Sequence, residues 1–299
     1  MMKKLSDFTF GIVGLGLMGG SLAKAIREYV LDEHNSTGKI LGCDVNAVSV
    51  SLSVEQHIVD KGYSSEQTDE MLRQCDFVYI CLYPHATLKF LQEHKSDFKS
   101  GAIVSDISGV KSLLFENMNS FLREDVDFIP GHPMAGSERE GYVHSSGEVF
   151  KNRNYIVLPL PSTKKENLEM FKLLITAMGF TRIIETDYHV HDHKIAFTSQ
   201  LCHVIASALV NSAEDTKITA FGGGSYEDLT RIALINAPLW TELFLSNKNE
   251  LLNHINNFQK SLETLKTAIE KDDSNAIEKY LEDVRVKRTA MSRIDTVEK

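Results

Sequence analysis

Residues 8–19, FTFGIVGLGLMG, contain the pattern G-x-G-x-x-G at Gly14, Gly16 and Gly19. The pattern follows an apolar run typical of a β-strand and opens a helical stretch, 21–30, which is the context that a dinucleotide-binding turn needs. Gly14 permits the tight turn, Gly16 lets the backbone approach a diphosphate, and Gly19 lets helix and strand pack closely. The expected cofactor contacts in this turn are Gly14, Leu15, Gly16, Leu17, Met18 and Gly19.

Two further strand ends are expected to complete the cofactor site. The run 40–44 ends in Asp44, whose carboxylate would accept hydrogen bonds from ribose hydroxyls and repel a 2′-phosphate. We therefore expect NAD rather than NADP as the cofactor. Leu82, Tyr83 and Pro84 follow the third clear strand, and in this topology their loop lies beside the ribose and nicotinamide.

The order of elements predicts an α/β chain with two domains. Short apolar runs alternate with helical stretches up to Leu158, which indicates a mainly parallel sheet covered by helices. Beyond Pro159 and Pro161 we expect one more helix and strand, and then only helices. The predicted domains are a Rossmann-type dinucleotide-binding domain, 1–162, and an all-α dimerisation domain, 163–299. The predicted strands are 8–13, 39–43, 77–82, 102–105, 126–130, 155–158 and 180–185, and the predicted later helices are 164–178, 191–210, 226–234, 238–256, 258–271 and 275–292.

The composition restricts the class of protein. The 299 residues include 32 Lys and Arg against 41 Asp and Glu, a net charge of −9, and such an acidic chain argues against a nucleic-acid partner. The chain has no apolar run long enough to span a membrane, no signal-peptide cleavage pattern and no C-x-x-C pair among its cysteines. We expect a cytoplasmic protein, and the apolar stripes of the helical half predict a homodimer formed through it.

A second candidate site lies at residues 131–138, GHPMAGSE. His132 follows the strand predicted at 126–130, and the carboxyl ends of parallel strands are where such sheets bind ligands. An ordinary histidine pKa of about 6.5 suits proton transfer at neutral pH. A loop histidine without chemistry is the alternative, but its position between glycines after a nucleotide-binding domain favours a catalytic base.

Five segments of the chain carry further motifs: GLGLMGGSLAKAI (14–26), SDISGVK (105–111), GHPMAGSEREG (131–141), SQLCHVIASALV (199–210) and GGGSYEDLTRIALINAPLW (222–240). Together they resemble the prephenate dehydrogenases, the NAD-dependent enzymes of tyrosine biosynthesis. The resemblance extends over nearly the whole chain. The histidine segment and the G-G-G-x-x-x-D-x-T-R-I segment are specific, whereas the glycine pattern is not.

This resemblance implies an activity and a set of site residues. Members of the family oxidise the ring C4 alcohol of prephenate by hydride transfer to NAD⁺, and loss of CO₂ gives 4-hydroxyphenylpyruvate. His132 matches the catalytic base, and Arg231 matches the arginine that pairs with a substrate carboxylate, which suits bidentate recognition of a dianion. Trp240 is either a pocket residue, contributed within the chain or across a dimer, or part of the core. The matched substrate residues are Glu138, His203, Gly224, Arg231 and Trp240.

The chain departs from the family pattern in two places. Many members read D-x-x-S-x-K after the fourth strand, with a serine that holds the histidine or the substrate hydroxyl. Here the serine is Ser108, one position early, and Gly109 stands at the usual position. We keep Ser108 as a catalytic candidate. In the family segment S-H-L-P-H, Gln200 replaces the first histidine, so only His203 carries over.

Several alternatives remain open. Arogenate could replace prephenate as the substrate, and the sequence does not separate the two. A β-hydroxyacid dehydrogenase is disfavoured because Lys194 is followed by Thr198 where that family has asparagine. An NAD-sensing module without catalysis is disfavoured by the presence of both His132 and Arg231. We also expect neither a regulatory domain after the helices nor a chorismate mutase segment before the sheet.

The sequence His189-Val190-His191-Asp192-His193 has the composition of a metal site. Alternate residues share a face only in a strand, and a helix is predicted to begin here. We therefore expect no metal, and we interpret Asp192 as a favourable charge near the amino terminus of that helix.

Overall fold

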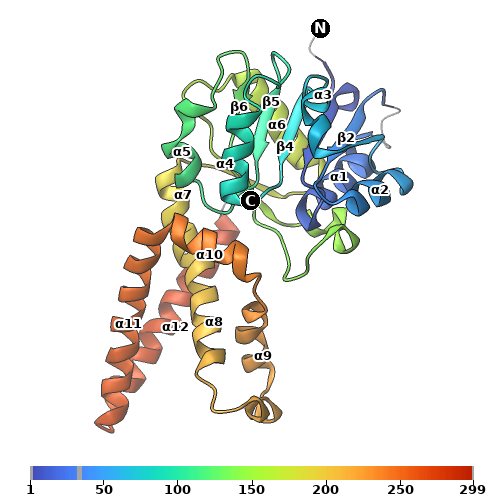
Figure 1. The fold of residues 1–299 in the computed structure, drawn as a ribbon. Coiled ribbons are helices and arrows are strands. Elements are labelled where there is room, and N and C mark those ends of the chain that lie inside the picture. The colour runs from blue at the N-terminus through green and yellow to red at the C-terminus, as the bar shows by residue number, and fades with distance from the viewer. Residues whose placement is uncertain (1–2, 32–35, 298–299) are drawn as a thin grey trace. The chain divides into compact units, whose positions relative to one another are not determined.

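The structure, a computed structural model, describes residues 3–31 and 36–297. The chain divides into two compact units, residues 1–248 and 249–299. The first unit contains two sheets and the helices α1 to α10, and the second consists of two long helices (Figure 1).

Six parallel strands form the main sheet of the first unit. Their order, β3-β2-β1-β4-β5-β6, is the doubly wound order of dinucleotide-binding folds. The edge strand β3 escaped prediction because its three residues, KGY, contain no apolar run. The strands are β1 (Thr9–Val13), β2 (Lys39–Cys43), β3 (Lys61–Tyr63), β4 (Phe77–Ile80), β5 (Ile103–Asp106) and β6 (Asp127–Phe128).

Helices cover both faces of this sheet, and each face has its own apolar core. On β4, Phe77 and Tyr79 face one core and Val78 and Ile80 the other, because successive side chains of a strand point to opposite sides. Burial on both faces explains why the strands read as continuous apolar runs. One face carries α1 (Leu17–Ile26) and α6 (Lys165–Ala177), and the other carries α3 (Thr68–Leu72), α4 (Pro84–Glu93) and α5 (Ser112–Glu116). The remaining helix of this region is α2 (Ala47–Glu55).

A second sheet of three strands corrects part of the prediction. It consists of β7 (Gly131–Pro133), β8 (Asn154–Val157) and β9 (Arg182–Glu185), with β7 antiparallel to β8 and β8 parallel to β9. The strand predicted at 126–130 is only the two residues of β6, since Pro130 has no N–H to donate to a neighbouring strand. His132 therefore lies within a strand and not in a loop.

The helical part of the first unit begins with one continuous helical stretch. It contains α7 (Tyr188–Ile195), a π-helical segment over 196–200 and α8 (Leu201–Asn211). Two shorter helices follow, α9 (Gly224–Thr230) and α10 (Ala237–Ser246). The predicted helix 238–256 is wrong, because the chain leaves helical geometry at Asn247. The Asn247 amide donates to the carbonyl oxygen of Asp192 at 2.8 Å and to Oε1 of Gln200 at 2.9 Å.

The second unit is a helical hairpin. It contains α11 (Lys248–Glu270, which starts at the last residue of the first unit) and α12 (Ser274–Val297). The hydroxyls of Ser261 and Tyr280 join the two helices at 2.6 Å. Both helices expose large apolar side chains, among them Leu262 and Leu281. No helix among the described residues is long and apolar enough to cross a membrane.

Candidate active site

A pocket with a volume of about 670 Å³ lies in the first unit. This volume is within the range typical of small-molecule sites. Its walls come from the glycine turn, from the loops that follow β4 and β5, from β7 and the segment after it, and from α8 and α10. The predicted site residues that line it are Gly16, Leu17, Met18, Leu82, Tyr83, Pro84, Ser108, His132, Glu138, His203, Arg231 and Trp240.

Gly14 and Gly19 form the turn beneath this pocket and do not line it. Gly14 has a φ of +89°, and its N–H donates to the carbonyl oxygen of Cys43 at 2.8 Å. A Cβ at Gly19 would lie 1.8 Å from the carbonyl oxygen of Gly14, so no other residue fits there. A Cβ at Gly16, by contrast, would meet nothing within 4 Å. The open space therefore lies in front of Gly16, where a diphosphate would approach.

Leu15 and Asp44 shape the same turn from outside the pocket lining. The Leu15 side chain is buried, and its N–H donates to Oδ2 of Asp44 at 2.6 Å. The N–H of Asn46 donates to Oδ1 of Asp44 at 2.7 Å. A carboxylate offers about four acceptor sites, so Asp44 can hold the turn and still accept bonds from ribose hydroxyls. Gly224, the first residue of α9, also lies outside the described pocket lining.

Asn236 joins three walls of the pocket and was missed by the sequence analysis. Its side-chain amide donates to the Tyr83 hydroxyl at 2.8 Å and to Oε1 of Glu140 at 2.6 Å. Its Oδ1 accepts the N–H of Leu239 at 2.9 Å and caps α10. The cofactor loop, the segment after β7 and α10 thus meet at one side chain. The asparagine before Ala-Pro was the available signal, but it indicated only a helix cap.

His132 heads a chain of hydrogen bonds that leads away from the pocket. Its Nδ1 lies 2.9 Å from Nε2 of His191, and Nδ1 of His191 lies 2.6 Å from Oδ1 of Asp192. Burial, together with the repulsion that a protonated His191 would exert and the charge of Lys111, holds the pKa of His132 well below its usual value. His132 is thus neutral at neutral pH, as a proton acceptor must be.

A buried ion pair holds the strand that carries His132. Nζ of Lys111 lies 2.6 Å from Oδ2 of Asp106 and donates at the same distance to the carbonyl oxygen of Gly131. Both charged side chains are fully buried. Burial lowers the pKa of Lys111, and the charge of Asp106 opposes that shift. Sequence reasoning missed this pair, although the quoted segment 105–111 contains both residues.

Ser108 and Gly109 differ in their relation to His132. The buried hydroxyl of Ser108 has no hydrogen-bond partner among the described residues, while its N–H donates to Oδ2 of Asp106 at 2.9 Å. A Cβ at Gly109 would lie 3.7 Å from Nε2 of His132, in ordinary contact. The position beside the imidazole is thus that of Gly109, where the family pattern has its serine.

His203 and Trp240 form a flat aromatic wall from within one chain. Their rings stack at a centroid distance of 3.6 Å. Nδ1 of His203 donates to the carbonyl oxygen of Ser199 at 3.0 Å, which leaves Nε2 as an acceptor. Burial and the charge of Arg231 lower the pKa of His203, although its bond to Ser199 opposes the shift. Gln200 is buried and donates to the carbonyl oxygen of Leu243 at 2.7 Å, so it joins the π-helical segment before α8 to α10.

The pocket is lined by more cationic than anionic side chains. Nη1 of Arg231 lies 3.3 Å from Oε2 of Glu138, and the Arg231 side chain is 61% exposed. Arg139 and Arg153 line the same pocket, as does Glu140. Arg139 lies in a segment quoted above, but no sequence signal pointed to Arg153. Three guanidinium groups in one pocket suit an anionic substrate and an anionic cofactor.

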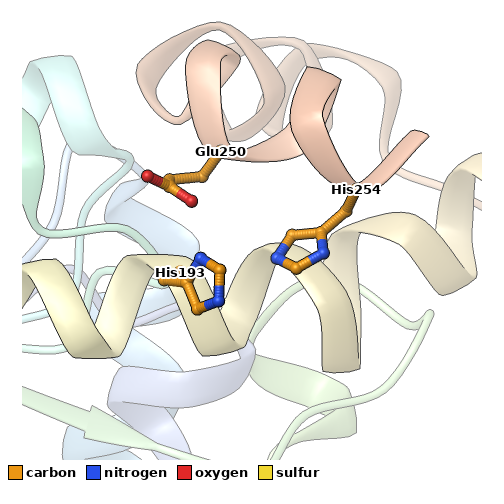
Figure 2. Close-up of side chains that lie close together, drawn as sticks. All are labelled: His193, Glu250 and His254. Carbon is orange, nitrogen blue, oxygen red and sulfur yellow. The ribbon is translucent and has the colours of Figure 1, made fainter. Parts of the chain in front are cut away.

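The three histidines of α7 differ in their exposure to solvent. His189 is exposed, His191 is fully buried, and His193 is half-buried. Figure 2 shows His193 on the helix that begins with α7, and Glu250 and His254 one turn apart on α11 of the second unit.

Asp192 is buried in the helix and bonded to its neighbours, so our interpretation of it as a charge near the helix end is wrong. The cap is Asp187, which accepts the N–H groups of His189 and Val190.

Comparison with known proteins identifies the family. A family model described as the nucleotide-binding domain of prephenate dehydrogenase matches residues 22–184, and one described as its dimerization domain matches residues 187–283. The chain therefore belongs to the prephenate dehydrogenase family of oxidoreductases. The predicted order of an α/β nucleotide-binding domain and a helical dimerisation domain is confirmed, while the boundary after residue 162 stays a prediction.

Three relatives show how far the likeness extends. A prephenate dehydrogenase of Lactococcus lactis is 31% identical over 287 residues, which cover 94% of this chain and 76% of the relative. A cyclohexadienyl dehydrogenase of Zymomonas mobilis is 26% identical over 94% of both chains. The crystal structure of Aquifex aeolicus prephenate dehydrogenase, in complex with hydroxyphenyl propionate and NAD⁺, has a TM-score of 0.85 and 30% identity. That likeness covers 97% of this chain and all of the other.

Proposed function

We propose that this protein catalyses the NAD-dependent oxidative decarboxylation of prephenate to 4-hydroxyphenylpyruvate, a step of tyrosine biosynthesis. The observation that carries the proposal is the position of His132. Its imidazole, with a lowered pKa and with Nδ1 occupied by His191, lines the pocket that also contains the glycine turn and three arginines. A base, a cofactor cradle and cationic groups in one cavity are what this reaction requires.

The residues of the cofactor side fit NAD. The backbone N–H groups at the start of α1 have no side-chain cap, and a Cβ at Gly16 would meet nothing within 4 Å, so there is room beside them for a diphosphate. Ser108 remains a candidate catalytic residue, since it lines the pocket and its buried hydroxyl has no hydrogen-bond partner among the described residues. Asp44 favours a free ribose hydroxyl over a 2′-phosphate. Bound NAD⁺ supplies the hydride acceptor.

His132 accepts the proton of the substrate hydroxyl and later returns it. As hydride leaves ring C4 for the cofactor, Nε2 of His132 accepts the proton of the C4 hydroxyl. The C1 carboxylate then leaves as CO₂, and the electrons of its bond to C1 make the ring aromatic. The imidazolium can return its proton to the phenolate oxygen, so no net proton is released. Lys111 and Asp106 keep β7, and with it the base, in position.

The substrate carboxylates require cations, and Arg231 is the principal candidate. A carboxylate of prephenate would replace Glu138 as the partner of Arg231, since their present contact is long and exposed. The stacked His203 and Trp240 offer a flat surface to the substrate ring. A backbone contact from Gly224 is proposed from the family resemblance alone.

A homodimer formed through the helical domain belongs to this proposal. Its support is the family model for a dimerization domain and the exposed apolar residues of α11 and α12. Large exposed apolar side chains that gather into a patch mark association sites.

A four-way comparison of rates tests the function. Prephenate and arogenate are each supplied with NAD⁺ or NADP⁺, and the appearance of reduced cofactor is followed. We expect fast turnover with prephenate and NAD⁺ only. Preference for arogenate would assign Glu138 and Glu140, which both line the pocket, to the substrate amine. No turnover with any pair would contradict the proposal.

A variant of His132 tests its role. We expect His132→Asn to keep its affinity for NAD⁺ and to lose at least 100-fold in kcat, because general-base catalysis contributes about 10²- to 10⁴-fold. His57→Asn is the matched control, since His57 is exposed at a φ of +58°, a backbone conformation that asparagine tolerates. Unchanged turnover in His132→Asn would remove the base from this mechanism.

A further inference from the structure

We infer that His191 and Asp192 are positioning residues that hold the proton of His132 on Nδ1 and thereby keep Nε2 free to act as the base. The inference rests on the proposed role of His132. It starts from three side chains joined in series, at 2.9 Å between the two imidazoles and 2.6 Å between His191 and the carboxylate.

The direction of each hydrogen bond in the series follows from the Asp192 carboxylate at its end. An ionised carboxylate only accepts, so Nδ1 of His191 carries the proton that points to Asp192. In a neutral His191 the other nitrogen, Nε2, is then an acceptor. Nδ1 of His132 must therefore donate to it, and the lone pair of a neutral His132 is left on Nε2. Burial lowers the pKa of His191, although its bond to Asp192 opposes the shift, which is consistent with a neutral ring.

Backbone N–H groups hold the carboxylate of Asp192 in place. The N–H of Ser112 donates to Oδ2 of Asp192 at 2.8 Å, the N–H of Lys111 donates to both oxygens, and the Ser112 hydroxyl donates to Oδ2 as well. Backbone donors at the start of α5 cannot become acceptors. Burial raises the pKa of Asp192, but the bonds from His191 and Ser112 outweigh burial and leave the pKa below its usual value. The site is thus built for a carboxylate and not for an amide.

Asp192→Asn tests the inference because it should exchange donor and acceptor in both hydrogen bonds of the series. The amide oxygen of an asparagine would face the backbone donors, so its NH₂ group would face His191. Nδ1 of His191 would then accept, Nε2 would donate to His132, and the His132 proton would move to Nε2. The equivalent change in serine proteases produces the wrong tautomer and lowers kcat by about 10⁴-fold. We expect a loss of at least 100-fold in kcat here, with unchanged affinity for NAD⁺.

The matched control is Asp187→Asn on the same helix. Asp187 caps α7 by accepting two backbone N–H groups, and asparagine caps helices equally well. We expect this variant to keep the wild-type rate, which would show that loss of a carboxylate from α7 is not in itself harmful.

Histidine ¹⁵N NMR reports the tautomer of His132, which would not change in Asp192→Asn if Asp192 had a purely structural role. In the wild-type protein the His132 signals, assigned by their absence in His132→Asn, should show a proton on Nδ1, and in Asp192→Asn a proton on Nε2. A wild-type proton on Nε2 would overturn the inference even if the variant does not fold. So would a wild-type rate in Asp192→Asn, or a slow Asp192→Asn that keeps the Nδ1 proton. Full activity of His132→Asn would instead contradict the proposed function.

Discussion

The glycine turn and the cluster behind His132 support one pocket and are built in opposite ways. The turn is made from consecutive residues and one carboxylate, Asp44, and its shape follows from backbone sterics. The cluster joins side chains from β5, the segment that leads into α5, β7 and α7, and buried charges hold it together. The difference indicates that cofactor binding depends on local geometry, whereas the chemistry depends on long-range contacts.

The buried ion pair of the cluster should show the largest effect on stability. Lys111→Met leaves Asp106 as an unpaired buried charge, and we expect a loss of about 3–5 kcal/mol in the free energy of unfolding. Lys61→Met is the matched control, because Lys61 and its partner Glu70 are 56% and 53% exposed. Breaking that exposed pair should lower the free energy of unfolding far less. Equal losses in urea unfolding of the two variants would mean that the cluster is not held by its charges.

In the glycine turn, the effect of replacing a glycine by alanine should depend on its position. Gly19→Ala forces a Cβ against the carbonyl oxygen of Gly14, and we expect a loss of about 1–3 kcal/mol from overpacking. Gly16→Ala meets open space, so it should leave the free energy of unfolding within about 0.5 kcal/mol of wild type. It should nevertheless weaken NAD⁺ binding roughly tenfold, a cost of about 1.4 kcal/mol, by obstructing the diphosphate. Calorimetric titration and urea unfolding separate the two effects; full NAD⁺ affinity in Gly16→Ala would refute this use of the open space.

The cluster should also make the stability of the protein depend on pH. The pKa values of His132 and His191 are both lowered in the folded protein, so the unfolded chain binds protons more readily below about pH 6.5. Stability should therefore fall as the pH falls from 6.5, by at most about 1.4 kcal/mol per pH unit for each histidine. Lys111 favours the neutral rings, whereas Asp192 and Asp106 oppose the shift at His191.

The measurement is the free energy of unfolding between pH 5 and 7 in wild type, His132→Asn and His57→Asn. We expect a shallower slope only in His132→Asn, because His57 is exposed to solvent. An identical slope in all three proteins would mean that His132 titrates normally in the folded state.

The sequence was sufficient wherever a property depends on neighbours along the chain. The glycine spacing, the acid at Asp44 and the alternation of strands and helices predicted the nucleotide-binding half. Residues matched to the family, such as His132, His203 and Arg231, meet in one pocket. Prediction from the sequence failed where the signal was weak or ambiguous, as at the short strand β3, at Pro130 and at the helix break of Asn247.

Only the tertiary structure decided what stands behind His132. In the sequence, His191 and Asp192 resembled a polar helix entry, and Lys111 was only the last residue of a family segment, without an assigned role. Of the buried side chains Lys111, Asp106, His191 and Asp192, three have a partner that is distant along the chain. Nζ of Lys111 bonds the carbonyl oxygen of Gly131, His191 bonds His132, and Asp192 accepts the N–H groups of Lys111 and Ser112. Local propensity predicts a helix or a turn, but the partner of a buried charge is determined by packing, because removal from water makes an unpaired charge too costly to keep.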